Sequence, residues 1–221
     1  MSYTHLLFDH DGVLVNTEPL YLQAIQEQLA THGIALQETD YIQNMAVGAD
    51  PWALARAAGC DEAMVDQLRD ARDTRYQQLL STRPITIEGV DDLIAELAEH
   101  FQLAIVTTSR DVDFDLIHAL DGQPRTSTTP DVVRHMEFIL KRSHYQYSKP
   151  DPQPYLLALS RFGIEPPQAL VIEDSERGLR SALAAGIDCA VIYHPFTERQ
   201  NFTEAKYRFA DLSELREFLL G

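Results

Sequence analysis

The chain begins with a hydrophobic run that ends in two carboxylates. Leu6, Leu7 and Phe8 have the composition of a central strand that is covered on both faces of its sheet. Side chains two positions apart on a strand point the same way, so Asp9 and Asp11 should face one spot. Two carboxylates at the rim of an apolar sheet repel each other unless a cation or a shared proton lies between them. This stretch alone fits a functional site and a solvated turn equally well.

Helical spacing replaces the strand pattern after the first strand. Thr17 is a candidate helix N-cap, and hydrophobic residues recur at helical spacing as far as Gly33. Further helices are predicted over 52–58 and 62–80. A helical stretch of roughly 70 residues is too long for a single crossover between two strands. We therefore expect residues 15–87 to form an inserted helical domain.

Predicted helices and strands alternate from residue 89 to the end of the chain. The expected helices are 90–100, 112–120, 154–162, 178–185 and 212–220, and the expected strands are 102–107, 137–140, 169–172 and 189–193. Alternation of this kind predicts a doubly wound parallel sheet of the α/β class, formed here by residues 1–14 and 88–221. Residues 121–135 are polar and rich in turn formers, so we expect a surface loop there.

Polar residues of complementary chemistry follow the predicted strands. An open parallel sheet binds its ligands beyond the carboxyl ends of the strands. Acidic groups from two strands can hold an oxygen-loving cation such as Mg²⁺, and a hydroxyl and a lysine opposite them would bind phosphoryl oxygens. That combination fits phosphoryl transfer to an aspartate. By strand alternation His10 should point away from its acidic neighbours, and we interpret it as a packing residue or as one that lies behind the site residues. The candidates are Asp9, Asp11, Thr107, Thr108, Ser109, Arg110, Lys149, Glu173, Asp174 and Ser175.

Each candidate also has an ordinary structural explanation. Thr107 fits a hydroxyl at a strand end, and Lys149 fits a surface lysine in a turn-forming stretch. Glu173 and Asp174 could cap the helix that follows them, and Arg110 could be a solvated loop residue. The joint pattern favours a site more strongly than any single member does.

Four short motifs carry these residues. They are Asp9-His-Asp-Gly-Val, Val106-Thr107-Thr-Ser, Ser148-Lys149-Pro-Asp-Pro and Val171-Ile-Glu173-Asp174-Ser-Glu-Arg-Gly178. In this order they resemble the four motifs of the haloacid dehalogenase (HAD) superfamily, and the match spans nearly the whole chain. The helical insertion between the first two motifs is similar to the cap of the branch that contains phosphoglycolate phosphatase and β-phosphoglucomutase. The resemblance implies a Rossmann-like HAD core with a helical cap.

The resemblance implies a reaction for the two aspartates. Asp9 would attack the phosphoryl group and form an aspartyl-phosphate. Asp11 would protonate the leaving oxygen and then activate water. The implied activity is that of a Mg²⁺-dependent phosphatase of a small phosphorylated metabolite, with the cap closing over the site and choosing the substrate.

The resemblance also implies two sets of binding residues. The candidates for the phosphoryl group are Thr107, Thr108, Ser109, Arg110 and Lys149. The candidates for Mg²⁺ are Asp9, the backbone carbonyl of Asp11, Asp174 and Glu173, where Glu173 lies either beside the ion or behind its ligands.

Three other activities are alternatives. A haloacid dehalogenase lacks the second carboxylate, so Asp11 argues against that activity. A mutase similar to β-phosphoglucomutase carries a histidine on the first cap helix and an arginine in the cap loop, where Tyr21 and Ala49 are the nearest positions here. A non-hydrolytic phospho-acceptor or binding module, similar in topology to response-regulator receivers, has no cap of this length and needs no second aspartate.

Charge and composition exclude several classes of partner. The net charge of −16 argues against nucleic acid and anionic membranes as partners, because both attract basic surfaces. Two cysteines, Cys60 and Cys189, indicate a reducing compartment rather than a disulfide framework. No hydrophobic run approaches the ~20 residues of a membrane span, and no signal precedes the first strand. We expect a cytoplasmic protein, and a monomer because no uncapped apolar helix face stands out.

Overall fold

A computed structural model describes residues 3–46, 49–120 and 130–221, which form two compact units. The first unit comprises Met1–Asn16 and Ile85–Gly221, and the second comprises Thr17–Pro84. The chain therefore passes between the units at 16/17 and at 84/85, whereas the expected boundaries lie at 14/15 and 87/88.

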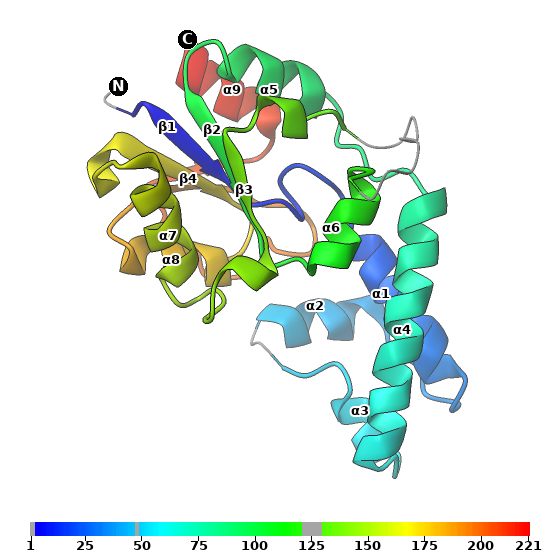
Figure 1. The fold of residues 1–221 in the computed structure, drawn as a ribbon. Coiled ribbons are helices and arrows are strands. Elements are labelled where there is room, and N and C mark those ends of the chain that lie inside the picture. The colour runs from blue at the N-terminus through cyan, green and yellow to red at the C-terminus, as the bar shows by residue number, and fades with distance from the viewer. Residues whose placement is uncertain (1–2, 47–48, 121–129) are drawn as a thin grey trace. The chain divides into compact units, whose positions relative to one another are not determined.

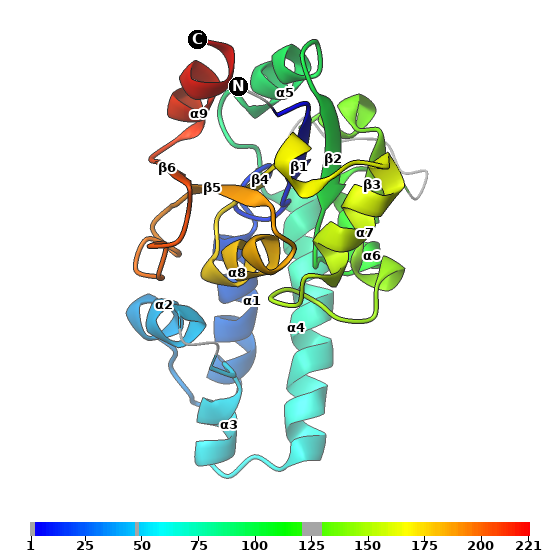
Figure 2. The ribbon, with the colours of Figure 1, turned by 90° about the vertical axis from the view of Figure 1, so that its left-hand side faces the viewer.

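Six parallel strands make up the sheet of the first unit, within the described part of the chain (Figure 1). Its order is β3-β2-β1-β4-β5-β6, so β1 lies in the middle, and β5 and β6 lie toward one edge (Figure 2). This arrangement confirms the predicted doubly wound α/β fold. The strands are β1 (His5–Phe8), β2 (Gln102–Val106), β3 (Phe138–Leu140), β4 (Ala169–Glu173), β5 (Asp188–Ile192) and β6 (Tyr207–Phe209).

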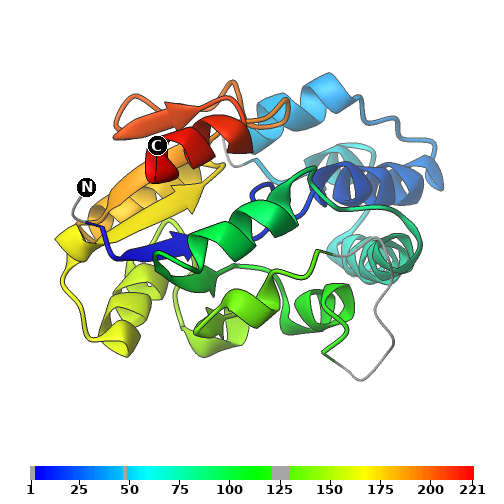
Figure 3. The ribbon, with the colours of Figure 1, turned by 90° about the horizontal axis from the view of Figure 1, so that it is seen from above.

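Helices cover both faces of this sheet (Figure 3). Leu6 and Phe8 of β1 pack in a cluster with residues of three helices, while Leu7 packs on the opposite face with residues of two others. Alternate side chains of β1 are thus buried on opposite sides, which explains its continuous hydrophobic run. The first group is α5 (Val90–Leu97), α6 (Asp111–Ile117) and α9 (Leu212–Leu220), and the second is α7 (Gln153–Phe162) and α8 (Glu176–Ala184).

Four helices form the second unit within the described residues, and α1 packs along α4. α2 was not predicted as a separate helix, because it is polar and buries only Tyr41 among its described side chains. Among all the described helices, none combines the length and hydrophobicity needed to span a bilayer. The helices are α1 (Glu18–Ala30), α2 (Glu38–Ala46), α3 (Ala53–Ala57) and α4 (Glu62–Thr82).

Two short segments of the first unit differ from expectation. The edge strand β6 was missed, because it has three residues and all of them are at least partly exposed. The expected loop over 121–135 lies mostly outside the described residues, but Val132 is fully buried in the core. Short 3₁₀ helices connect the larger elements: η1 (Val133–His135), η2 (Arg142–His144) and η3 (Pro166–Gln168).

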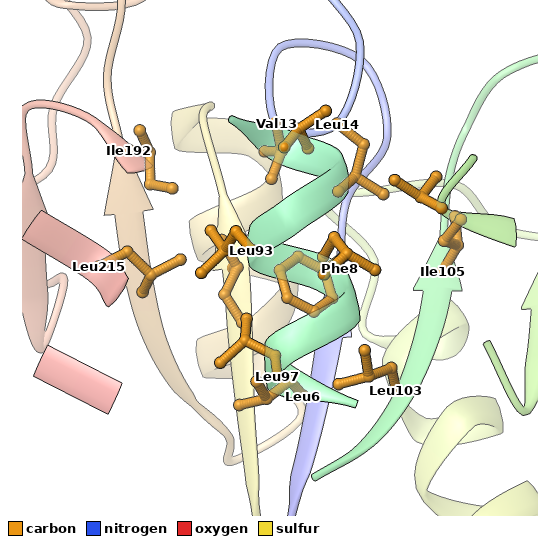
Figure 4. Packing of buried hydrophobic residues seen from close by; sticks show 14 of the residues in the cluster. Leu6, Phe8, Val13, Leu14, Leu93, Leu97, Leu103, Ile105, Ile192 and Leu215 are labelled. Carbon is orange, nitrogen blue, oxygen red and sulfur yellow. The ribbon is translucent and has the colours of Figure 1, made fainter. Parts of the chain in front are cut away.

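Phe8 is the residue at which we test the packing of the hydrophobic core of this sheet (Figure 4). Its side chain is fully buried among residues of α5 and β2. Because Phe8→Ala leaves a cavity, it should lower the free energy of unfolding by about 3–5 kcal/mol in urea denaturation. The control Leu156→Ala removes a side chain that is 47% exposed, and it should change stability by no more than about 0.5 kcal/mol. Equal losses in the two variants would contradict this picture of the core.

Candidate active site

A buried lysine joins the carboxyl ends of three strands. Lys149 Nζ donates to Asp9 Oδ1 at 2.8 Å, to Glu173 Oε1 at 2.7 Å and to the carbonyl of Val106 at 2.7 Å. Val106 and Glu173 end β2 and β4, and Asp9 follows β1 directly. Asp9 N also donates to the carbonyl of Ile172, which continues the pairing of β1 with β4. The sheet register and the three hydrogen bonds of Lys149 therefore bring residues of all four motifs together.

Burial and charge set the protonation of this group. Burial raises the pKa of Asp9 to about 8, and the negative charge of Glu173 adds to the rise, while Lys149 opposes it. Burial also acts to raise the pKa of Glu173, but the charge and hydrogen bond of Lys149 hold it below its usual value. Burial acts to lower the pKa of Lys149, yet its two carboxylate partners raise it overall. The shifts in the pKa of Lys149 and of Glu173 both favour the charged forms of this pair.

Both oxygens of Glu173 are engaged by the protein. Oε1 also accepts from Tyr155 Oη at 2.8 Å, and Oε2 accepts from Ser175 Oγ at 3.1 Å and from the backbone N–H of Asp174 at 3.2 Å. A Cβ at Gly178 would lie 1.8 Å from the Glu173 carboxyl carbon. Any side chain at residue 178 would displace this carboxylate, so the glycine keeps α8 in close contact with it.

Asp174 adds a third buried carboxylate. Side-chain oxygens of Asp9, Glu173 and Asp174 all lie within 4.8 Å of one another. Burial raises the pKa of Asp174, and a hydrogen bond from His194 opposes the rise. Three carboxylates face one ammonium group, and oxygen-only donors of this kind suit a hard divalent cation. The residues present therefore fit a metal site.

A second group gathers at the end of β2. Thr107 Oγ1 lies 2.8 Å from Ser109 Oγ and accepts from the backbone N–H of Ser109 at 3.0 Å. Ser109 Oγ donates to Asp11 Oδ2, and Tyr145 Oη donates to the carbonyl of Thr107 at 2.5 Å. Thr107 is buried, whereas the Asp11 side chain is 33% exposed. The structure thus places a hydroxyl-rich turn beside the second aspartate.

Comparisons with known proteins agree with this geometry. A family model described as haloacid dehalogenase-like hydrolase matches residues 6–192. Protein CbbY of Rhodobacter capsulatus is 31% identical, covering 96% of this chain and 95% of that protein. The chain belongs to the haloacid dehalogenase-like hydrolase family. The predicted superfamily and the prediction of a HAD-type enzyme are therefore confirmed.

Two further relatives of the HAD family have names or bound ligands that concern phosphorylated compounds. N-acetylmuramic acid 6-phosphate phosphatase of Pseudomonas aeruginosa is 28% identical, covering 89% of this chain and 84% of that protein. CbbY of Rhodobacter sphaeroides has been solved in complex with phosphate and, as a mutant, with xylulose-(1,5)bisphosphate. These structures are 26% identical, cover 96% of both chains and have a TM-score of 0.74.

Thr108 of the second motif and Arg110, which follows that motif, have other partners. Thr108 Oγ1 accepts from Arg177 Nη2 at 3.2 Å on the surface. The Arg110 guanidinium pairs with Asp113 through two hydrogen bonds of 2.9 and 3.1 Å. The structure therefore does not place either side chain in the group around Lys149.

Two histidines of this HAD core contact the predicted aspartates. His10 is fully buried, with Nε2 at 2.9 Å from His118 Nε2, and its Nδ1 lies 3.4 Å from Asp11 Oδ2. Its ring packs as expected, but it also reaches the aspartate. His194 Nε2 lies 2.8 Å from Asp174 Oδ2 and was not predicted at all. Its position two residues after β5 was the available signal, because ligands of this fold bind beyond strand ends.

The raised pKa of Asp9 predicts that metal binding depends on pH. A divalent cation must displace the proton that Asp9 holds below its pKa of about 8. The affinity for Mg²⁺ should therefore weaken as pH falls below this value, by up to about tenfold per pH unit. Calorimetric titrations at pH 6, 7 and 8 measure the effect, with Asp9→Asn as the variant that removes the titrating group. An affinity that is equal at pH 6 and pH 8 would contradict the prediction.

Proposed function

We propose that this HAD-like hydrolase is a Mg²⁺-dependent phosphatase of small phosphorylated sugars that works through an aspartyl-phosphate. The observation that carries the proposal is the buried Lys149 ammonium group at 2.8 Å from the Asp9 carboxylate. A phosphoryl group brings two negative charges to an attacking carboxylate, and the repulsion between them must be neutralised. A buried lysine whose pKa is raised by its carboxylate partners supplies part of this neutralisation beside the nucleophile.

The proposed reaction has two balanced steps. A carboxylate oxygen of Asp9 attacks phosphorus, the bond to the sugar oxygen breaks, and Asp11 gives its proton to that oxygen. Asp11 then takes a proton from water, the resulting hydroxide attacks phosphorus, and the bond to Asp9 breaks with release of phosphate. Thr107 and Ser109 support the proposal as hydroxyl donors beside Asp11.

Mg²⁺ in this proposal is held by Asp9, Asp174 and the backbone carbonyl of Asp11. When bound, it would neutralise phosphoryl charge. Glu173 is the carboxylate whose two oxygens are already engaged, by Lys149 and Tyr155 on one side and by Ser175 on the other. We therefore assign Glu173 to fixing Lys149 rather than to binding the ion.

Sugar phosphates are the proposed substrate class because of the relatives. One is named as a phosphatase of a phosphorylated amino sugar, and another has been solved with a sugar bisphosphate. The test is a panel of phosphomonoesters with Mg²⁺ that contains sugar phosphates, phosphoglycolate, nucleotides and cofactor phosphates. We expect phosphate release, fastest from sugar phosphates. A stable phosphorylated protein without turnover would favour a phospho-acceptor, and isomerisation of a sugar phosphate without release would favour a mutase.

Asp9→Asn should abolish turnover. The amide can still accept the hydrogen bond from Lys149 but cannot attack phosphorus, so kcat should fall on the order of 10⁴-fold or more. The circular dichroism spectrum and the urea midpoint check that the variant folds. Activity within tenfold of the wild type would show that another residue is the nucleophile.

Asp11→Asn should slow both chemical steps. Loss of general acid–base catalysis costs about 10²–10⁴-fold, and rapid-quench single-turnover experiments with a sugar phosphate separate formation of the intermediate from its hydrolysis. p-Nitrophenyl phosphate is the matched control substrate, because its leaving group departs without a proton. With that substrate only the hydrolysis step should slow. An unchanged single-turnover rate with the sugar phosphate would remove the acid–base role from Asp11.

A further inference from the structure

We propose that His194 positions the carboxylate of Asp174 for metal binding, and that it does so as a hydrogen-bond donor and not as a ligand. The inference rests on the metal site of the proposed function. Its starting observation is the distance of 2.8 Å between His194 Nε2 and Asp174 Oδ2. His194 comes from the segment after β5, whereas Asp174 follows β4 directly, so the contact joins two neighbouring strand ends.

The surrounding backbone fixes which ring nitrogen carries the hydrogen. The backbone N–H of Phe196 donates to His194 Nδ1 at 3.3 Å, so Nδ1 uses its lone pair as an acceptor. A neutral imidazole with an unprotonated Nδ1 has its hydrogen on Nε2. Nε2 is therefore the donor to Asp174 Oδ2, and it has no lone pair for a cation. This tautomer excludes direct ligation through Nε2 in the structure as it stands.

The backbone of His194 is held in a hydrogen-bonded turn. The carbonyl of His194 accepts from the backbone N–H groups of Thr197 at 2.8 Å and Glu198 at 2.9 Å. The backbone N–H of His194 donates to Thr197 Oγ1 at 3.2 Å, and Thr197 is buried. The turn fixes the backbone of His194 and the Phe196 N–H holds its ring, so the imidazole loses little freedom when it donates to Asp174.

Gly12 makes the space for this contact. Its backbone has φ of +83°, and a Cβ there would lie 2.3 Å from Asp174 Oδ2 and 2.8 Å from His194 Nε2. A side chain at position 12 would collide with both the carboxylate and the imidazole, and the positive φ also favours glycine there. Gly12 of the first motif thus leaves the space in which Asp174 and His194 meet.

Fixing one oxygen of Asp174 orients the other. A carboxylate whose Oδ2 is held by the imidazole cannot rotate freely, so its second oxygen is presented in one direction. Residues that hold metal ligands in this manner commonly contribute 10–100-fold to metal affinity. His194 therefore raises the affinity of the site for a divalent cation without contacting it.

The test compares His194→Phe with His194→Gln. Phenylalanine keeps a ring but removes the donor, whereas the glutamine amide can replace the Nε2 hydrogen. Mn²⁺ is the probe, and the electron paramagnetic resonance signal of the free ion reports binding without substrate or turnover. His194→Phe should weaken Mn²⁺ binding about 10–100-fold, and His194→Gln should restore most of the loss. His32→Phe, at an exposed histidine of the helical unit, should bind as the wild type does.

Four outcomes decide between the possibilities. Binding by His194→Phe as tight as that of the wild type would overturn the inference. Equal weakening in the phenylalanine and glutamine variants would also overturn it, because a donor would then not suffice. Wild-type protein that binds Mn²⁺ but hydrolyses no phosphomonoester would refute the proposed function and leave this inference standing. Wild-type protein that binds no Mn²⁺ would overturn both.

Discussion

The three hydrogen bonds of the buried Lys149 ammonium group are the interaction on which the site depends. An ammonium group has three N–H donors and no acceptor, and here each donor meets an oxygen from a different strand end. Burying an ion costs several kcal/mol unless its partners are well placed and fully hydrogen-bonded. Within the described residues, every buried side-chain nitrogen and oxygen has a hydrogen-bond partner. The ion pair is therefore tolerated because all three N–H groups meet oxygens, and because the pairing of β1 with β4 places Asp9 and Glu173 side by side within reach of the lysine.

The negative charge that Lys149 does not balance explains which groups surround the three carboxylates. One ammonium group cannot balance the carboxylates of Asp9, Glu173 and Asp174, and burial keeps the pKa of Asp9 and Asp174 raised. Neutral groups of Tyr155, Ser175 and His194 compensate in part. Gly12 and Gly178 leave the space that these carboxylates occupy, because a Cβ at either position would collide with Asp174 or Glu173. The same surplus that makes the group costly without a cation makes it suitable for one.

The sequence allowed the sheet and the strand-end residues to be predicted because both follow from general rules. Buried parallel strands are continuous hydrophobic runs, and their carboxyl ends meet at one edge. The rules failed where burial is slight, as in α2, which buries only Tyr41 among its described side chains, and in β6, whose three residues are all at least partly exposed. His194 was missed for another reason. Its role depends on the adjacency of β4 and β5 and on the tautomer set by the Phe196 N–H, and neither can be derived from a single histidine after a strand.

All residues of the candidate site belong to the α/β unit, and the helical unit contributes none of them. The two connections between the units leave the α/β unit together, because Asn16 N donates to the carbonyl of Ile85 at 2.8 Å and Val15 forms an antiparallel bridge with Thr86. The first of them starts a few residues after Asp11, just beyond the turn closed by the hydrogen bond from Gly12 N to the carbonyl of Val15 at 2.8 Å. Substitutions in residues 17–84 therefore leave every member of the lysine-centred group in place.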